Sequence, residues 1–450
     1  MSTFQTATRM RPTRKNTLGQ TPKLSHAPCD KPLSSQASLR VLFPESILDV
    51  FLLFVVVVMY KRIGMSNESI LHTTSAALLP LLFKPFAISM AGRLHISHTA
   101  TRLGFFLAFV FLLTMAHGIK NAASNIQYFS LFSLAISFCL ISNTRPLCTV
   151  NAPAAATDAP WRKCAISYEI AILALMGGLV MFAGVLEVYT RQPRTSWAVS
   201  CVVMAIFLLS LSLYRHFSTI RHGSAEACNK YSFLSAEPSS APMADKLRHL
   251  WHTTCIIVCF LPLFFSLRLL PLFLLDRESA GGLGFSTSDT GLLQGCIAVA
   301  GLLVGAAIGR KVIQRYGQKN TLAPMSLLLS LVNAVSILLA YQQFSSLPLV
   351  GICLFVACCG VGASSISLLK WQIMVSNNNT QNYTCHADTT TAAAGMILSG
   401  LISAYLLPLG YLNAFILLTG LLAPLSFLAA SFMRTRLPKE TKRETTITDS

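Results

Sequence analysis

The sequence predicts an all-α membrane protein with about 12 transmembrane helices in two six-helix bundles, and three observations lead to this prediction. Of its 450 residues, 53% are hydrophobic and only 12% are charged, far less charge than soluble proteins carry. Twelve apolar runs are long enough to cross a bilayer, which takes about 20 helical residues. A polar stretch divides these runs into two sets of six. A soluble fold could not bury this much apolar surface.

Each apolar run is bounded by charged or turn-forming residues, as expected for helices that end at a membrane surface. The first six spans are expected at residues 41–60, 69–91, 102–118, 126–148, 163–187 and 196–215. The last six are expected at residues 251–276, 289–309, 321–341, 347–369, 389–408 and 412–433.

The segments between and beyond the spans define the predicted domains. Residues 1–40 are expected to be a disordered basic tail, without the apolar region and cleavage site of a signal peptide. The predicted bundles, residues 41–215 and 251–433, are joined by a polar cytoplasmic linker at 216–250, and a second tail covers 434–450. Two bundles of equal helix number are typical of secondary transporters.

The distribution of basic residues predicts the orientation, because short cytoplasmic loops carry the excess of Lys and Arg. With the N-terminus inside, 27 of the 35 basic residues fall in cytoplasmic segments and 6 fall outside, while Lys84 and Arg268 lie within spans. Both termini are therefore expected in the cytoplasm. The net charge of +18 then reflects helix ends that face anionic lipid, and no nucleic-acid partner is expected.

The 13 cysteines contain no Cys-x-x-Cys pair, and eight of them lie in apolar runs, where cysteine packs as a small apolar residue. We therefore expect no metal site and no cofactor. The glycosylation sequons at Asn378 and Asn382 fall in a predicted cytoplasmic loop, so we do not expect them to be used.

Three blocks of sequence carry a resemblance to a known family. The first is VVVVMYKRIGMSN at residues 55–67, followed by LLPLLFKP at 78–85. The second is LFLLDRE at 272–278, followed by GGLGFST at 281–287. The third has Gly301, Gly305 and Gly309 four residues apart, then Arg310, Arg315 and Gly317. Together they resemble the muropeptide permease (AmpG-type) branch of the major facilitator superfamily, and Bacteroidetes-like members look closest.

The resemblance implies a function as well as a fold. It implies a multi-pass permease of the inner membrane, working as a monomer, that moves a small solute by alternating access with coupling to proton flow. The solute would be a muropeptide or another amphipathic anion. In the third block, glycines four apart would let a neighbouring helix approach closely, and the basic residues after them would hold the loop in the cytoplasm.

Two alternatives to transport remain open at this point. The chain reads Glu45-Ser46-Ile47-Leu48 where the family usually has Glu-Gly-x-Pro, and Met90-Ala91-Gly92-Arg93 where an aspartate is expected. These departures keep open a receptor that retains the fold without transport. A membrane-embedded enzyme is disfavoured, because the sequence has no Gly-x-Ser-x-Gly, no His-Glu-x-x-His and no paired aspartates in adjacent spans.

Ionisable residues within the spans are the candidates for substrate binding or coupling, because a charge in the hydrocarbon region is costly. They are Glu45, Asp49, Lys84, Glu169 and Arg268. We expect Asp49 to pair with Lys84, which could instead extend its amine to the interface. Arg268 could meet an anionic group of the substrate or reach the outer surface. Glu169 could carry a coupling proton or lie at the interface.

The charged residues at the end of the seventh span have a simpler interpretation. Asp276, Arg277 and Glu278 follow the last apolar residue directly, and we interpret them as topological anchors.

Overall fold

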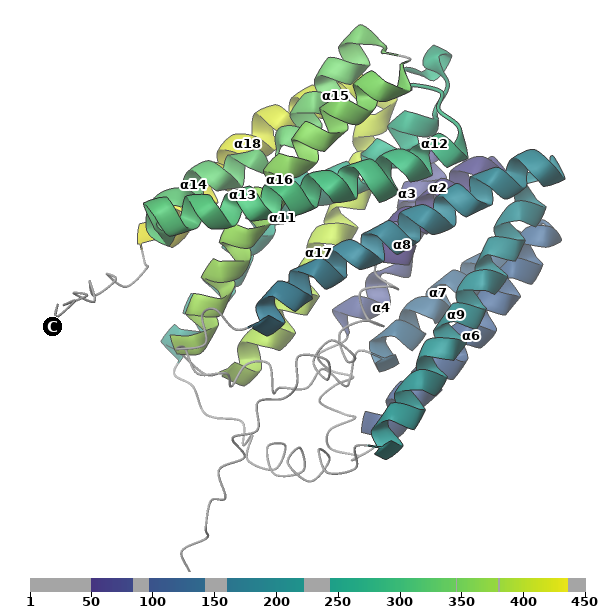
Figure 1. Cartoon of the computed structure of the whole chain (residues 1–450), viewed down its shortest axis with the longest axis horizontal. Coiled ribbons are helices and arrows are strands. Elements are labelled where there is room, and N and C mark those ends of the chain that lie inside the picture. The colour runs from purple at the N-terminus through teal and green to yellow at the C-terminus, as the bar shows by residue number, and fades with distance from the viewer. Residues whose placement is uncertain are drawn as a thin grey trace, which may run out of the picture. The chain divides into compact units, whose positions relative to one another are not determined.

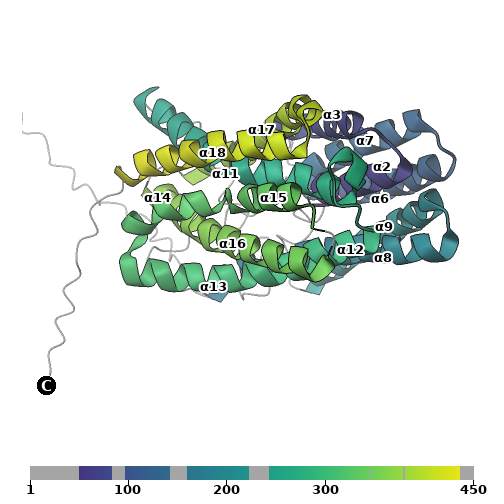
Figure 2. The same ribbon diagram turned by 90° about the horizontal axis from the view of Figure 1, so that it is seen from above.

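The computed structural model describes residues 50–83, 97–141, 160–221, 243–344, 346–378 and 381–435. Within these ranges every regular element is a helix (Figures 1 and 2). Nine of the described helices are long and apolar enough to cross a bilayer, and Ala393–Leu409 forms a shorter apolar one. Each of the 12 predicted spans overlaps a described helix or consecutive described helices, and the prediction of an all-α polytopic protein is confirmed.

The N-terminal half, residues 50–221, supplies the first six spans. A π-helix, η1 (Phe51–Val55), continues into α2, and the second span is divided into α3 and α4. The remaining spans are single helices. The bounds are α2 (Val56–Ile63), α3 (Asn67–Ala77), α4 (Leu79–Leu82), α6 (Ser97–Lys120), α7 (Ser124–Ile141), α8 (Pro160–Thr190) and α9 (Pro193–Arg221).

The C-terminal half, residues 243–435, supplies the last six. The eighth span consists of α12, a π-helix and α13, and the ninth consists of α14 and α15. The bounds are α11 (Met243–Leu275), η5 (Glu278–Ala280), α12 (Thr287–Leu292), η6 (Leu293–Ile297), α13 (Ala298–Tyr316), α14 (Gln318–Leu328), α15 (Leu331–Gln342), α16 (Leu347–Asn378), α17 (Gln381–Leu406), η7 (Leu407–Leu409) and α18 (Tyr411–Thr435). Helices α9 and α11 thus extend into the predicted linker from both sides.

Prolines remove backbone hydrogen bonds in two of the spans. Pro80 has no N–H to donate, and the second span changes from α3 to α4 just before it. In α11, Pro262 cannot donate to the carbonyl of Val258, and the Ser426 hydroxyl of α18 donates to that carbonyl instead, at 3.2 Å. A neighbouring helix thus satisfies the backbone group that a proline leaves open inside a membrane.

The glycines of the third sequence block lie against α16. A β-carbon on Gly301 would stand 2.6 Å from the carbonyl oxygen of Phe355, and one on Gly309 would stand 2.8 Å from the Cα of Ala363. Gly305 meets the backbone of Cys359 in the same way. These residues advance by four on both helices, so α13 and α16 run in parallel with their backbones in close contact. The predicted close approach is present, and α16 is the neighbouring helix.

Several helix pairs join the halves, and in two of these contacts glycine allows close approach. We name the first the α8 seam, where α8 crosses α12 and η6. There Gly177 lies on the backbone of Gly295, and a β-carbon on Gly291 would stand 2.5 Å from the amide nitrogen of Met181. We name the second the α17 seam, where Gly400 of α17 lies against Ser75 of α3. Small residues let helices pack closely in a bilayer, where no hydrophobic effect drives them together.

Candidate functional site

The site begins with a turn that aims two polar residues of the N-terminal half at the C-terminal half. Helix α2 ends at Gly64, whose φ of 100° favours glycine, and Ser66 caps α3 by accepting a hydrogen bond from the backbone N–H of Ser69. Lys61 in the last turn of α2 and Asn67 at the start of α3 are thereby brought together. The Lys61 Nζ donates to the Asn67 Oδ1 at 2.6 Å.

The loop after α11 fixes Asp276 opposite this turn. Gly281 and Gly284 have positive φ values of 79° and 69°, which let the chain fold back on the helix end. The Gly284 N–H donates to the Asp276 carbonyl at 2.6 Å, and the Leu283 N–H donates to that of Phe273 at 3.0 Å. The loop therefore acts as a cap, and the Asp276 carboxylate projects from a fixed backbone.

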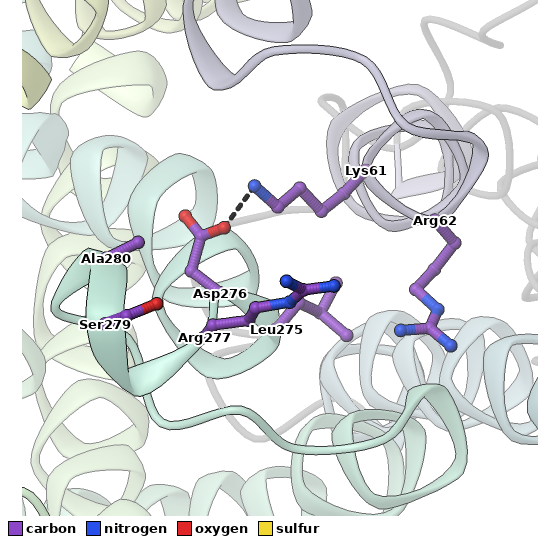
Figure 3. Close-up of a pocket in the computed structure, with 7 residues that line it drawn as sticks. All are labelled: Lys61, Arg62, Leu275, Asp276, Arg277, Ser279 and Ala280. Carbon is purple, nitrogen blue, oxygen red and sulfur yellow. Dashed lines mark ion pairs between the residues drawn. The ribbon is translucent and has the colours of Figure 1, made fainter.

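The Asp276 carboxylate is the centre of a polar cluster across the two halves, which we name the outer network: Lys61, Asn67, Asp276 and Tyr411. Lys61 forms an ion pair with Oδ1. Oδ2 accepts hydrogen bonds from Asn67 Nδ2 at 2.6 Å and from the Tyr411 hydroxyl at 2.5 Å. Figure 3 shows Lys61 reaching from α2 to Asp276. Because both carboxylate oxygens have partners, the charge of a mostly buried aspartate is compensated.

A second polar cluster lies beside the first and contains Arg62, Glu187 and Thr287. Arg62 binds Glu187 of α8 through two nitrogens, Nε at 3.1 Å and Nη2 at 2.5 Å from Oε1. The Thr287 hydroxyl of α12 donates to Oε2 of the same carboxylate at 2.7 Å, so this cluster also joins the halves. Figure 3 shows Arg62 pointing away from Asp276, so the two neighbouring cations serve different carboxylates.

Between the clusters lies a pocket of about 260 Å³ (Figure 3). Its lining includes Lys61, Arg62, Asp276, Arg277 and Ser279. The two polar clusters and this pocket lie at the helix ends that the basic-residue distribution predicts to face away from the cytoplasm, and we call this end the outer mouth.

Of the five ionisable candidates within the predicted spans, Arg268 is the one whose side chain the structure describes. It is 0% exposed, two turns before the end of α11. Its Nη1 donates to the Thr74 hydroxyl of α3, and its guanidinium carbon lies 3.6 Å from where a β-carbon on Gly400 of α17 would stand. Arg268 therefore lies in the α17 seam, and does not reach the outer surface.

The other predicted site residues have different outcomes. Glu45, Asp49 and Lys84 lie outside the described residues, so the Asp49–Lys84 pair stays a prediction. Glu169 belongs to α8, but its side chain is not among those described. In the third block, Gly317 has a φ of 78° at the turn into α14, and the Arg315 guanidinium lies 5.6 Å from the Tyr316 ring centroid. The conformational role of Arg310 and Arg315 stays a prediction.

Sequence reasoning missed the outer network. The interpretation of Asp276 as a topological anchor does not account for its burial or for its three partners. The available signal was that Lys61 and Asn67 belong to the first family-like block and Asp276 to the second. Tyr411 lies outside all three blocks and carried no such signal.

Comparisons with known proteins support the fold and little beyond it. No protein-family model and no curated protein sequence matches the chain. Among solved structures, a POT family transporter in complex with 5-aminolevulinic acid is 15% identical with a TM-score of 0.61, covering 90% of this chain and 96% of its own. The xylose transporter XylE from E. coli, in an inward open conformation, is 10% identical with a TM-score of 0.57, covering 91% and 97%.

The nucleoside transporter NupG is 12% identical with a TM-score of 0.57, and the match covers 90% of this chain and all of that one. At such low identities the likeness establishes the fold alone, which this chain shares with these solved transporters.

Proposed function

We propose that this protein is a secondary transporter of the major facilitator type that carries a small solute by alternating access. The observation that supports the proposal most strongly is the outer network, which joins Lys61 and Asn67 of one half to Asp276 and Tyr411 of the other. Hydrogen bonds and ion pairs at the edge of an interface can break and reform at modest cost, so they suit a contact that must open in every cycle.

The glycine seams support the same proposal. The α8 and α17 seams bring backbones of the two halves into contact without interlocking large side chains. Such surfaces can separate and meet again as rigid bodies, as alternating access requires. In this proposal, the described conformation is closed at the outer mouth and changes to one in which both polar clusters are broken.

The finer parts of the proposal come from the resemblance. We propose an inner-membrane location with both termini cytoplasmic, a monomer, proton coupling, and a muropeptide-like or other amphipathic anion as solute. A receptor that retains the fold without transport is the alternative, and a membrane-embedded enzyme is the weaker one. The solved transporters of similar fold favour transport over both.

Uptake into proteoliposomes tests transport directly. We expect labelled anhydro-muropeptide to accumulate when an inward proton gradient is imposed and to equilibrate slowly without it. N-acetylmuramic acid and N-acetylglucosamine form a matched pair of simpler probes, because only the first carries a carboxylate. Absence of gradient-driven uptake for all of these probes would contradict the muropeptide-like assignment.

The opening of the outer mouth can be measured without a known solute. Spin labels at Val188 of α8 and Leu409 of η7, both exposed, would report the distance between the halves in a variant lacking the 13 native cysteines. We expect Gly177→Ala to shift the distribution to longer distances, because its β-carbon meets the backbone of Gly295. Gly178→Ala is the matched control, since a β-carbon there has nothing within 4 Å. Equal distributions for the two variants would contradict closure through the α8 seam.

A further inference from the structure

The guanidinium of Arg268 lies in a polar recess between three helices. Thr74 and Ser75 of α3 lie on one side and Gly400 of α17 lies on the other. The side chains of Arg268, Thr74 and Ser75 are all buried. The absence of a side chain at Gly400 makes room for the Ser75 hydroxyl, with which a β-carbon there would clash. The same β-carbon would lie in ordinary contact with the guanidinium carbon, at 3.6 Å.

Only part of this guanidinium is bonded. Nη1 donates to Thr74, whose own hydroxyl donates onward to the carbonyl of Ile70 at 2.7 Å. Nε and Nη2 have no hydrogen-bond partner in the described part of the chain, and neither does the Ser75 hydroxyl. Unsatisfied donors are costly at membrane depth, and a buried cation without a carboxylate is costlier still.

The unsatisfied nitrogens form one edge of the guanidinium, and the same protein shows what that edge binds. Arg62 uses the corresponding atoms to hold the Glu187 carboxylate: Nη2 donates to Oε1 at 2.5 Å, and Nε lies 3.1 Å from Oε1 and 3.3 Å from Oε2. Parallel N–H groups at this spacing match the two oxygens of a carboxylate or a phosphate. In Arg268 the same edge carries no such group from any described residue.

We propose that the Nε and Nη2 edge of Arg268 binds a carboxylate or phosphate of the transported solute, with the Ser75 hydroxyl as a third donor. This inference rests on the proposed transport function and adds to it a binding point for the anionic group of the solute. Binding between the halves also links the solute to the cycle, because Ser75 and Arg268 belong to opposite halves and an anion between them contacts both.

A built-in carboxylate tests the edge without any knowledge of the solute. Ser75→Asp places a carboxylate beside the guanidinium, and Ser75→Asn has the same size without the charge. With Arg268 present, we expect Ser75→Asp to melt about 3 °C higher than Ser75→Asn. In the Arg268→Gln background, the order should reverse. The same difference in both backgrounds would overturn the proposal, because the edge would then not accept a carboxylate.

Asp49 provides a second decisive outcome, since it lies outside the described residues and could be the group that occupies the edge. If Asp49 did so, Asp49→Asn would lower the melting temperature with Arg268 and leave it unchanged with Arg268→Gln. That result would overturn the proposal. We expect Asp49→Asn to have the same effect in both backgrounds.

Uptake of N-acetylmuramic acid separates a failure of this inference from a failure of the proposed function. We expect Ser75→Asp and Arg268→Gln each to reduce uptake at least tenfold. Arg268→Lys should retain more uptake than Arg268→Gln but less than the wild type, because lysine keeps the charge without the two parallel N–H groups of the guanidinium. If Ser75→Asp stabilises the protein only when Arg268 is present, but no uptake is seen, transport is refuted and the anion-binding edge is supported. Uptake that survives Arg268→Gln would refute the edge and keep transport.

Discussion

The cations of the outer mouth and the cation of the α17 seam differ in what compensates them. Lys61 and Arg62 each face a carboxylate, while Arg268, the most buried of the three, has only the Thr74 hydroxyl among the described residues. The first arrangement joins helices of the two halves. The second leaves part of the cost of a buried charge unrecovered, and such a cost is tolerated where function requires it. In the proposed cycle, the first set of charges closes the outer mouth and Arg268 is available to a solute.

The largest expected effect comes from removing the carboxylate at the centre of the outer network. Asp276→Asn keeps the size of the side chain but leaves Lys61 without its counter-charge. We expect a loss of about 3 kcal/mol in the free energy of unfolding, at the lower end for a buried pair because Lys61 is 18% exposed and reaches water. Thermal unfolding in detergent measures the loss, and the labels at Val188 and Leu409 should report a longer distance.

Glu278→Gln is the matched control for this variant, because Glu278 lies two residues away in the same loop and is exposed. We expect no change in stability or distance. If Asp276→Asn behaved like Glu278→Gln, the outer network would be incidental to closure, and the contrast with Arg268 would lose its basis.

An effect of opposite sign is expected at Arg268. Arg268→Met replaces a buried, partly bonded charge with an apolar side chain of similar length, a change that often stabilises proteins. We expect the free energy of unfolding, measured by thermal unfolding, to rise by about 2 kcal/mol, and N-acetylmuramic acid uptake to be lost. Lys61→Met provides the comparison and should be destabilising, because it leaves Asp276 unpaired. A loss of stability in Arg268→Met would mean that the guanidinium is compensated after all.

The sequence was sufficient to predict the helices but not their polar contacts. Hydropathy located the described spans because a bilayer imposes a similar length on each of them. Arg268 stood out for the same reason, as a single charge within an apolar run. Asp276 did not, because charges mark the ends of most spans and nothing local distinguishes an anchor from a bonded residue. Its partners Asn67 and Tyr411 lie 209 and 135 residues away, so only the folded chain brings them together.

The smallest of the three effects should come from Tyr411→Phe, which removes one donor from the outer network. The ring remains packed against Phe273, at 5.4 Å between centroids, and Asp276 keeps Lys61 and Asn67 as partners. We therefore expect the free energy of unfolding to fall by about 1 kcal/mol in thermal unfolding, and the spin-label distance to stay the same. Tyr405→Phe, at a tyrosine that is 76% exposed, is the control and should change neither quantity. A loss as large as that of Asp276→Asn would mean that the Tyr411 hydroxyl, and not the Lys61 charge, holds the carboxylate. The contrast between Lys61 and Arg268 would then depend on hydrogen bonds and not on ion pairs.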